Sequence, residues 1–242
     1  MIARFLVHIR SASEEDKSNA VEHLIKSSTL STDFFVLVAL SSAMATLGLL
    51  EGSPAIVIGS MLIAPVLYPI LTLALSVSLA DRTLIMRSGN ALVRSMGLAL
   101  LVSTLTALLF GIGIEPTPEV LARTAPSLLS VLVAVISGFA VAYAVARPNL
   151  SATLPGVAVA VSLIPPLGVV GIGISLLSWP IVSGALVMFL VNVGGILLSA
   201  LLTFSLMDVH PLRRTAVVTA KTEDTLVEKE VAEENKKAET SS

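Results

Sequence analysis

The chain has no cysteine and little charge. The absence of cysteine among its 242 residues excludes disulfides, thiolate metal sites and thiol nucleophiles. Charged residues make up 13% of the sequence, against about 25% in soluble domains. The formal net charge of −2 comes without any basic patch interleaved with aromatics, so no nucleic-acid partner is predicted.

Ionisable residues are also missing where chemistry inside a membrane needs them. His8, His23 and His210 lie outside the long apolar segments, and no Asp or Glu lies in the middle of one. Intramembrane proteases need a Ser with a His or Lys, or a pair of Asp. A proton relay needs a buried carboxylate. The sequence therefore predicts no enzyme, no metal site and no cofactor.

What the chain has in abundance is apolar sequence. Hydrophobic residues make up 55% of it, with a mean hydropathy of +0.92, which predicts an all-α integral membrane protein embedded in the lipid bilayer. A bilayer core requires roughly 20 apolar residues per helix. Six segments are near that length: 33–50, 54–79, 88–114, 126–146, 152–178 and 180–207.

Basic residues indicate the orientation. With six spans and a cytoplasmic N-terminus, every Lys and Arg of the 15 except Arg123 lies on the cytoplasmic side, as the positive-inside rule requires. We therefore expect a multi-pass protein of the cell inner (plasma) membrane with both termini in the cytoplasm.

Three regions lie outside the membrane segments. In the cytoplasmic region 1–32, apolar and polar residues alternate over 1–10, as in a half-buried strand. Residues 13–28 have the pattern of an amphipathic helix. A surface-lying helix and a short βα cap both fit this region. Residues 115–125 form an extracytoplasmic linker. The charged tail, 208–242, fits disorder or a frayed helix.

Two of the six segments carry prolines at mid-depth: Pro65 and Pro69 in the second, and Pro165 and Pro166 in the fifth. Proline removes a backbone hydrogen bond and clashes with the preceding turn. In hydrocarbon the freed polar groups must face protein or a water-filled cavity. Helices 2 and 5 are therefore expected to break, with half-helices that begin at Pro65 and Pro165. A kink that serves only packing is the alternative.

The two halves of the membrane region, 33–114 and 126–207, are related in sequence. The segment from Leu37 to Ser42 matches that from Leu132 to Ser137, and the halves also align Pro65 with Pro165 and Asn90 with Asn192. Each half holds three helices, and an odd number makes the second copy enter the membrane from the opposite side. The sequence thus predicts two inverted three-helix repeats, as in secondary transporters.

The junction of the two breaks is the candidate binding site. Amides after each break carry partial positive charge and favour an anion or a carboxylate, whereas carbonyls before it suit a cation. The candidate substrate-binding residues are Ser60, Ala64, Pro65, Tyr68, Pro69, Asn90, Ser162, Pro165, Pro166, Gly168 and Asn192.

Small and polar residues on the membrane helices have a second interpretation. Hydroxyls such as those of Ser60 and Ser162 often bond back to their own helix, and polar or small stripes commonly pack helices together. The fourth segment has a small-residue stripe that suits contacts within the subunit or within a homo-oligomer. The two stripes are Asn192, Gly195, Ser199 and Thr203, and Ala134, Gly138, Ala142 and Ala146.

Several runs resemble one family. They are ALSSAMATLGLLEGSPAIVIGSMLIAPVLYPIL, the ARTAP run at 122–126, LPGVAVAVSLIPPLGVVGIGIS, and VNVGGILL. Over about residues 31–207 the chain is similar to the prokaryotic hydrophobic domain of unknown function 389. The resemblance implies a multi-spanning inner-membrane protein with a transport role and no assigned chemistry. Family members often carry an additional folded cytoplasmic domain.

Three functions are compatible with these patterns. The leading one is a secondary transporter or facilitator of a small anionic or carboxylate-bearing solute, because the two proline breaks fall in inverted repeats. A passive channel is the second. The third is a non-transporting scaffold or signalling component that acts through its N-terminal segment and charged tail.

Overall fold

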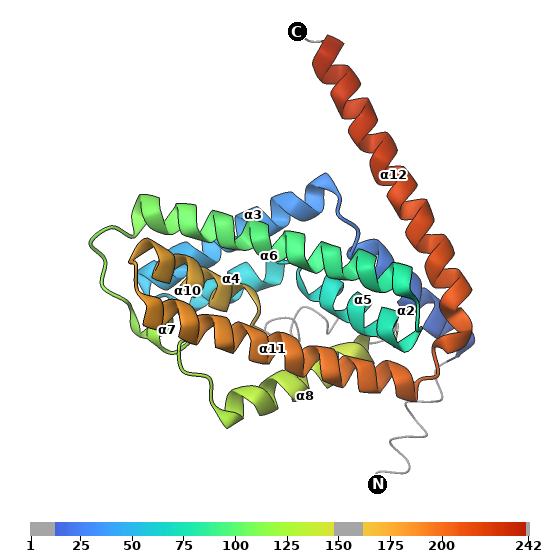
Figure 1. Ribbon diagram of the computed structural model, residues 1–242, viewed down its shortest axis with the longest axis horizontal. Helices are drawn as coiled ribbons and strands as arrows, with labels where there is room; N and C mark the ends of the chain where they lie inside the picture. Colours follow the sequence, from blue (N-terminus) through green and yellow to red (C-terminus); the bar gives the residue numbers. More distant parts are fainter. Residues whose placement is uncertain (1–12, 148–161, 241–242) are drawn as a thin grey trace.

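The computed structural model describes residues 13–147 and 162–240, and every regular element within them is a helix (Figure 1). The expected all-α class is confirmed for this part of the chain. The α-helices are α2 (Glu14–Ser27), α3 (Thr32–Glu51), α4 (Pro54–Ile63), α5 (Leu67–Ser78), α6 (Arg82–Phe110), α7 (Pro118–Leu121), α8 (Leu128–Val145), α10 (Ile164–Ser175), α11 (Trp179–Leu206) and α12 (Arg213–Thr240). A single 3₁₀ turn, η2 (His210–Leu212), precedes α12.

Four helices are long and apolar enough to cross a membrane: α3, α6, α8 and α11. The pair α4 and α5 passes the same test together and makes a fifth span bent by 50°. The apolar α10 has 12 residues, and residues 152–161 of the same predicted segment lie outside the described part. The described residues thus contain four to five helices that could span a membrane, of the six spans that the sequence predicts.

The break in the second span falls at Pro65. Helix α4 ends at Ile63, and its C-cap Ala64 has an extended backbone (ψ 120°), because the proline ring disfavours helical geometry in the residue before it. Helix α5 starts two residues after the proline, at Leu67, where the sequence placed the start at Pro65 itself. The Tyr68 amide donates to the Pro65 carbonyl (3.1 Å), which tightens the turn.

Helix α10 begins at Ile164, with Pro165 and Pro166 in its first turn. Proline is tolerated there because the first amides of a helix have no intrahelical acceptor. The preceding Ser162 has a positive φ of 42°, a conformation that costs a non-glycine residue free energy. A helix that starts at these prolines is therefore present, one residue earlier than expected, and the first part of the predicted fifth span lies outside the described residues.

The half-helices are packed in the middle of the bundle. Helix α5 lies against α6 and α11, and α10 lies against α11, α6 and α3. The side chains beside both breaks, Val66 and Leu67 on one and Leu163 and Ile164 on the other, belong to one continuous apolar core. The start of α10 therefore lies inside protein, whereas the first break, where Ala64 and Pro65 are half-buried, lies at the edge of the core.

The N-terminal helix α2 docks onto α5. Its apolar residues Val21, Leu24 and Ile25 are at most 2% exposed, and α2 packs against α5 and α12. The Thr72 hydroxyl of α5 donates to the Leu24 carbonyl at 3.0 Å. The apolar face of α2 is therefore buried against protein. The strand pattern at 1–10 lies outside the described residues.

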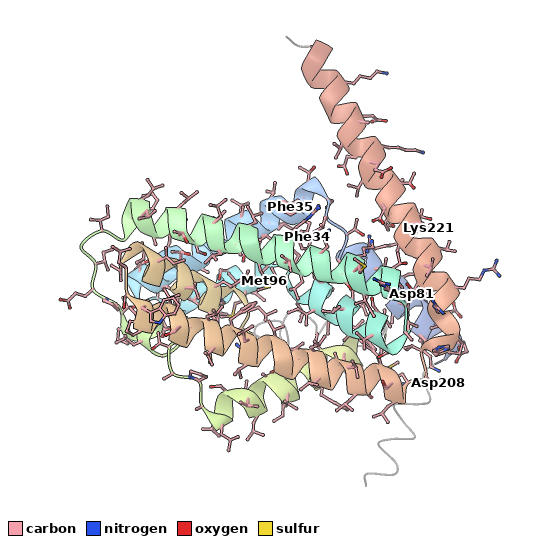
Figure 2. The ribbon with its side chains drawn as sticks, in the orientation of Figure 1. Phe34, Phe35, Asp81, Met96, Asp208 and Lys221 are labelled. Atoms are coloured by element: carbon pink, nitrogen blue, oxygen red, sulfur yellow. The ribbon has the colours of Figure 1, made fainter. Side chains whose placement is uncertain are left out.

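The charged tail, for which disorder or a frayed helix is expected, is the long helix α12. Its first turns pack on α2 through Ala216 and Ala220, which are 0% and 4% exposed. From Lys221 onward none of the described side chains is buried, and Figure 2 shows this part of the helix projecting from the bundle. Good helix formers such as Ala, Glu and Lys sustain it where packing does not.

Ion pairs of the described residues lie at both ends of the bundle, and the end with more of them is called the charged end. At the end where α2 and α12 lie, Arg213 pairs with Asp81 (2.9 Å) and Arg87 with Asp224 (2.9 Å). At the opposite end, which carries α7, Arg123 pairs with Glu119 at 2.7 Å (Figure 1).

Candidate functional site

The second break is held by an asparagine from a neighbouring helix. Asn192 of α11 donates from Nδ2 to the Ser162 carbonyl at 2.9 Å, and its residue is 5% exposed. Ser162 is the residue with positive φ just before α10. The bond is part-buried, and a carbonyl left without a donor there costs free energy, so this bond stabilises the strained turn from which α10 starts.

The first break is tied to α3. Ser41 donates from its hydroxyl to the Ser60 carbonyl at 2.9 Å, three residues before α4 ends. The Ser60 hydroxyl itself donates to the Val57 carbonyl of its own helix at 2.6 Å, and Ser60 is 0% exposed. The alternative of back-bonding is therefore what Ser60 does, and its carbonyl is also engaged.

The remaining residues of the first break lie at the boundary between core and surface. Ala64, Pro65 and Tyr68 are half-buried, whereas Pro69 is buried. The Tyr68 ring meets His23 of α2 edge-on, with 5.7 Å between ring centroids. The N-terminal helix therefore reaches the start of α5, a contact that nothing in the sequence pattern signals.

At the second break, Pro165 and Pro166 are buried in the first turn of α10. Gly168 lies where α10 crosses α3. A Cβ on Gly168 would come 2.9 Å from Leu49 Cδ1 and 3.5 Å from the Thr46 hydroxyl, so this glycine allows the two helices to approach closely.

The two asparagines that the sequence aligns have different surroundings. Asn192 is buried at the break, but Asn90 is exposed and lines a groove of about 300 Å³ at the charged end of the bundle. Arg87 and Arg94 of α6 line the same groove. The structure therefore groups Ser162, the two prolines of α10 and Asn192, and it separates Asn90 from them.

The small-residue stripe of α8 packs within the subunit. A Cβ on Gly138 would come 2.6 Å from the Ile196 Cα of α11, and a Cβ on Gly195 would come 2.7 Å from the Ala134 Cβ. The Ser199 hydroxyl donates to the Gly195 carbonyl at 2.7 Å. Of the two uses the sequence left open, the described structure employs this stripe for contact between α8 and α11.

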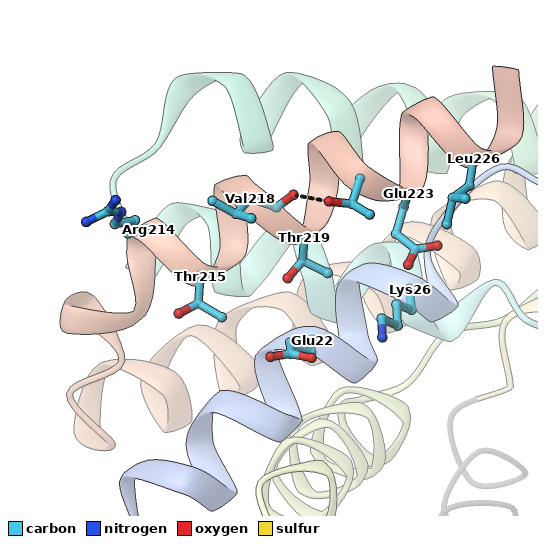
Figure 3. Close-up of a pocket in the computed structure, with 9 residues that line it drawn as sticks. Glu22, Lys26, Arg214, Thr215, Val218, Thr219, Glu223 and Leu226 are labelled. Carbon is cyan, nitrogen blue, oxygen red and sulfur yellow. Dashed lines mark hydrogen bonds between the residues drawn. The ribbon is translucent and has the colours of Figure 1, made fainter. Parts of the chain in front are cut away.

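A second groove, of about 560 Å³, lies between α2 and α12 (Figure 3). Lys26 of α2 and Glu223 and Leu226 of α12 are among its lining residues. Within residues 13–147 and 162–240 no cluster of His, Cys, Asp or Glu could hold a metal ion. The two breaks and the two grooves between the helices and the charged tail are thus the polar features that could bind a ligand.

Comparison with known proteins agrees with these features. The chain is 29% identical over 209 residues to an uncharacterized protein of Methanocaldococcus jannaschii, an alignment that covers 83% of this chain and 65% of that protein. The chain thus spans somewhat less than two thirds of that relative's length. No solved structure matches the chain. Residues 61–198, which include both breaks, match the family model described as domain of unknown function DUF389, and the chain belongs to this family.

Proposed function

We propose that this protein is a secondary transporter or facilitator of a small anionic or carboxylate-bearing solute, which binds where the two interrupted spans meet. The observation that carries the proposal is the pair of apolar half-helices, α5 and α10, which start at proline breaks inside the bundle. Discontinuous helices in the two halves of a membrane protein commonly form the substrate site of a transporter.

The helix boundaries support an architecture of six spans in two inverted repeats. Helices α5 and α10 each have 12 residues, and both boundaries of α10 lie 97 residues after those of α5: Leu67 to Ile164, and Ser78 to Ser175. The starts of α6 and α11, Arg82 and Trp179, have the same separation. A constant separation of 97 residues aligns Pro69 with Pro166. The sequence alone favours the alignment of Pro65 with Pro165, and the two alignments differ by three residues.

The turn after each half-helix supports the same relation. Ala80 and Leu177, also 97 residues apart, have positive φ values of 51° and 52°. The next amide donates back to an equivalent carbonyl in both turns, Asp81 to Ser76 (3.2 Å) and Ser178 to Gly173 (2.9 Å). Such turns commonly end helices, but a non-glycine residue is uncommon at positive φ, and its recurrence at the separation of the helix boundaries supports the repeat.

The contacts between helices show the same relation between the two halves. Each half-helix contacts the long helix that follows it, α5 with α6 and α10 with α11. Each also contacts the long helix of the other half, α5 with α11 and α10 with α6. A pseudo-two-fold axis in the membrane plane would produce this exchange of partners and would bring the two breaks to similar depth.

The chemistry of the junction supports a small solute. Helix ends leave amides and carbonyls without intrahelical partners. In the first turns of α5 and α10, prolines, which have no N–H, replace some of these amide donors. The carbonyls of Ser60 and Ser162 are already occupied by Ser41 and Asn192. Apart from the Tyr68 amide, which donates to the Pro65 carbonyl, the amides at the starts of α5 and α10 remain as the positive ends of helix dipoles, which favour an anion.

The charge distribution supports cytoplasmic termini in an inner membrane. Arg87, Arg213 and the helices α2 and α12 lie at one end, and Arg123 at the other. Basic residues concentrate on the cytoplasmic side of membrane proteins. Labelling single cysteines introduced at Ser27 and Ala122 from either side of the membrane tests this orientation, because the chain has no cysteine of its own.

Flux through purified protein in liposomes tests the proposed function. We expect saturable uptake of at least one of chloride, acetate or aspartate under a proton or sodium gradient. Ala64→Leu, which fills the half-buried break, should abolish uptake. Gly97→Ala, on a helix face with nothing within 4 Å of a new Cβ, should preserve it. Flux linear in concentration would identify a passive channel, and the absence of flux from folded protein contradicts both.

A further inference from the structure

The charged end of the bundle offers a second site. We propose that Arg87, Asn90 and Arg94 of α6 bind the phosphate headgroup of an anionic phospholipid, and that Asp224 of α12 is a built-in competitor for this site. This inference is independent of whether the protein transports a solute.

The three residues share one face of α6, since positions separated by three, four and seven residues line up on a helix. They line the groove of about 300 Å³ together with residues 28–30 and α12. Asn90 and Arg94 are exposed. Neither side chain makes a hydrogen bond to the described part of the chain, so both have donors available for phosphate oxygens. Arginine suits such oxygens because its donors form a planar fork.

Arg87 already holds a carboxylate in the position proposed for phosphate. Its Nε lies 2.9 Å from Asp224 Oδ1, and its Nη2 donates to the Thr29 hydroxyl at 3.0 Å. The Asp224 side chain is 55% exposed, and exposed ion pairs contribute little to stability. Glu228 of α12 lines the groove as well, so two carboxylates of the tail face the two arginines.

The part of helix α12 that lines the groove is held weakly on the bundle. Past Ala220 none of its described side chains is buried, and Figure 2 shows Lys221 where the helix begins to leave the bundle. A competing anion would therefore displace Asp224 without disrupting a packed interface. The Asp224 carboxylate keeps Arg87 paired until a headgroup replaces it.

The length of α6 puts the groove at headgroup depth. Its 29 residues span about 43 Å at 1.5 Å per residue, whereas a bilayer hydrocarbon core is about 30 Å thick. Counted from Phe110 at the far end, Arg94 is about 24 Å away and Arg87 about 35 Å away. With Phe110 placed at the far boundary of the hydrocarbon core, the near boundary falls between Arg94 and Arg87, next to the headgroup layer in which phospholipid phosphates lie. A lipid therefore suits this groove better than a soluble anion.

Titration of the full-length protein in neutral detergent with dioctanoyl phosphatidylglycerol tests the proposal, with dioctanoyl phosphatidylcholine as the uncharged comparison. Phosphatidylglycerol should bind more tightly. Arg94→Gln should weaken its binding about fivefold, the effect of one basic residue near an anionic surface. Arg82→Gln makes the same charge change on the same helix outside the groove and should leave binding unchanged.

Asp224→Asn should act in the opposite direction and strengthen phosphatidylglycerol binding, because it removes the competitor. Glu230→Gln, the same charge change on α12 away from the groove, should have no effect. Equal binding of the two lipids, equal losses in Arg94→Gln and Arg82→Gln, or no gain in Asp224→Asn would overturn the proposal. So would displacement of the lipid by an equal concentration of inorganic phosphate, which would identify a site for a soluble anion.

Discussion

Removing the Asn192 amide is expected to destabilise the second break more than removing any exposed amide. In Asn192→Ala the Ser162 carbonyl loses its donor at a site where Asn192 is 5% exposed. A buried carbonyl left unpaired costs about 1–3 kcal/mol, and side-chain hydrogen bonds in membrane proteins average about 0.6 kcal/mol. We therefore expect a loss of about 1–2 kcal/mol in the free energy of unfolding.

Two further variants sharpen this prediction. Asn90→Ala removes the same chemical group from an exposed position on α6 and should leave stability unchanged. Ser162→Gly should stabilise the protein by about 1 kcal/mol. Serine loses free energy of folding at the positive φ of 42°, which glycine tolerates.

Thermal unfolding in detergent, followed by the fluorescence of the single tryptophan, Trp179, measures all three variants. Hydrogen exchange of α10 localises the change, because loss of the Asn192 bond should increase exchange in the first turns of α10 before the rest of the bundle. Equal unfolding temperatures for Asn192→Ala and Asn90→Ala would refute the role assigned to Asn192.

Two other predictions concern packing and charge. Gly138→Ala should destabilise the protein by about 1–3 kcal/mol, as overpacking does, because the new Cβ would lie 2.6 Å from the backbone of α11. Gly97→Ala has open space around the new Cβ and should be neutral or stabilising by up to about 1 kcal/mol. Calorimetry in detergent compares the two variants. The Leu84 amide and the Arg213 guanidinium lower the pKa of Asp81. Asp81→Asn keeps a helix-capping side chain but loses this charge effect. A lowered folded-state pKa stabilises above the ordinary carboxyl value of about 3.9 and ceases to do so as pH falls through the folded value. Wild type should therefore be more stable than Asp81→Asn at pH 7, by at most about 1 kcal/mol, as measured by thermal unfolding. The difference should shrink as the pH falls below the ordinary carboxyl value and vanish below the folded-state pKa of Asp81; an undiminished difference at acidic pH contradicts the assignment.

The helix boundaries at the candidate site were predictable in part. Pro65, Pro165 and Pro166 identify them because proline chemistry acts locally, whatever the rest of the chain does. The alignment of the two proposed repeats was not predictable, since apolar segments align almost equally well when shifted by three residues. The 97-residue separation appears only in helix boundaries such as Leu67 and Ile164.

The sequence by itself determined the all-helical class, the apolar spans, the break at Pro65 and the grouping of basic residues, because hydropathy, proline and charge act over a few residues. The tertiary structure decided which side chain meets which. It alone distinguishes Asn192, buried against Ser162, from Asn90 in an open groove, and it alone docks α2 on α5. Such partners are far apart in the chain, and their choice depends on how whole helices pack, which no local pattern encodes.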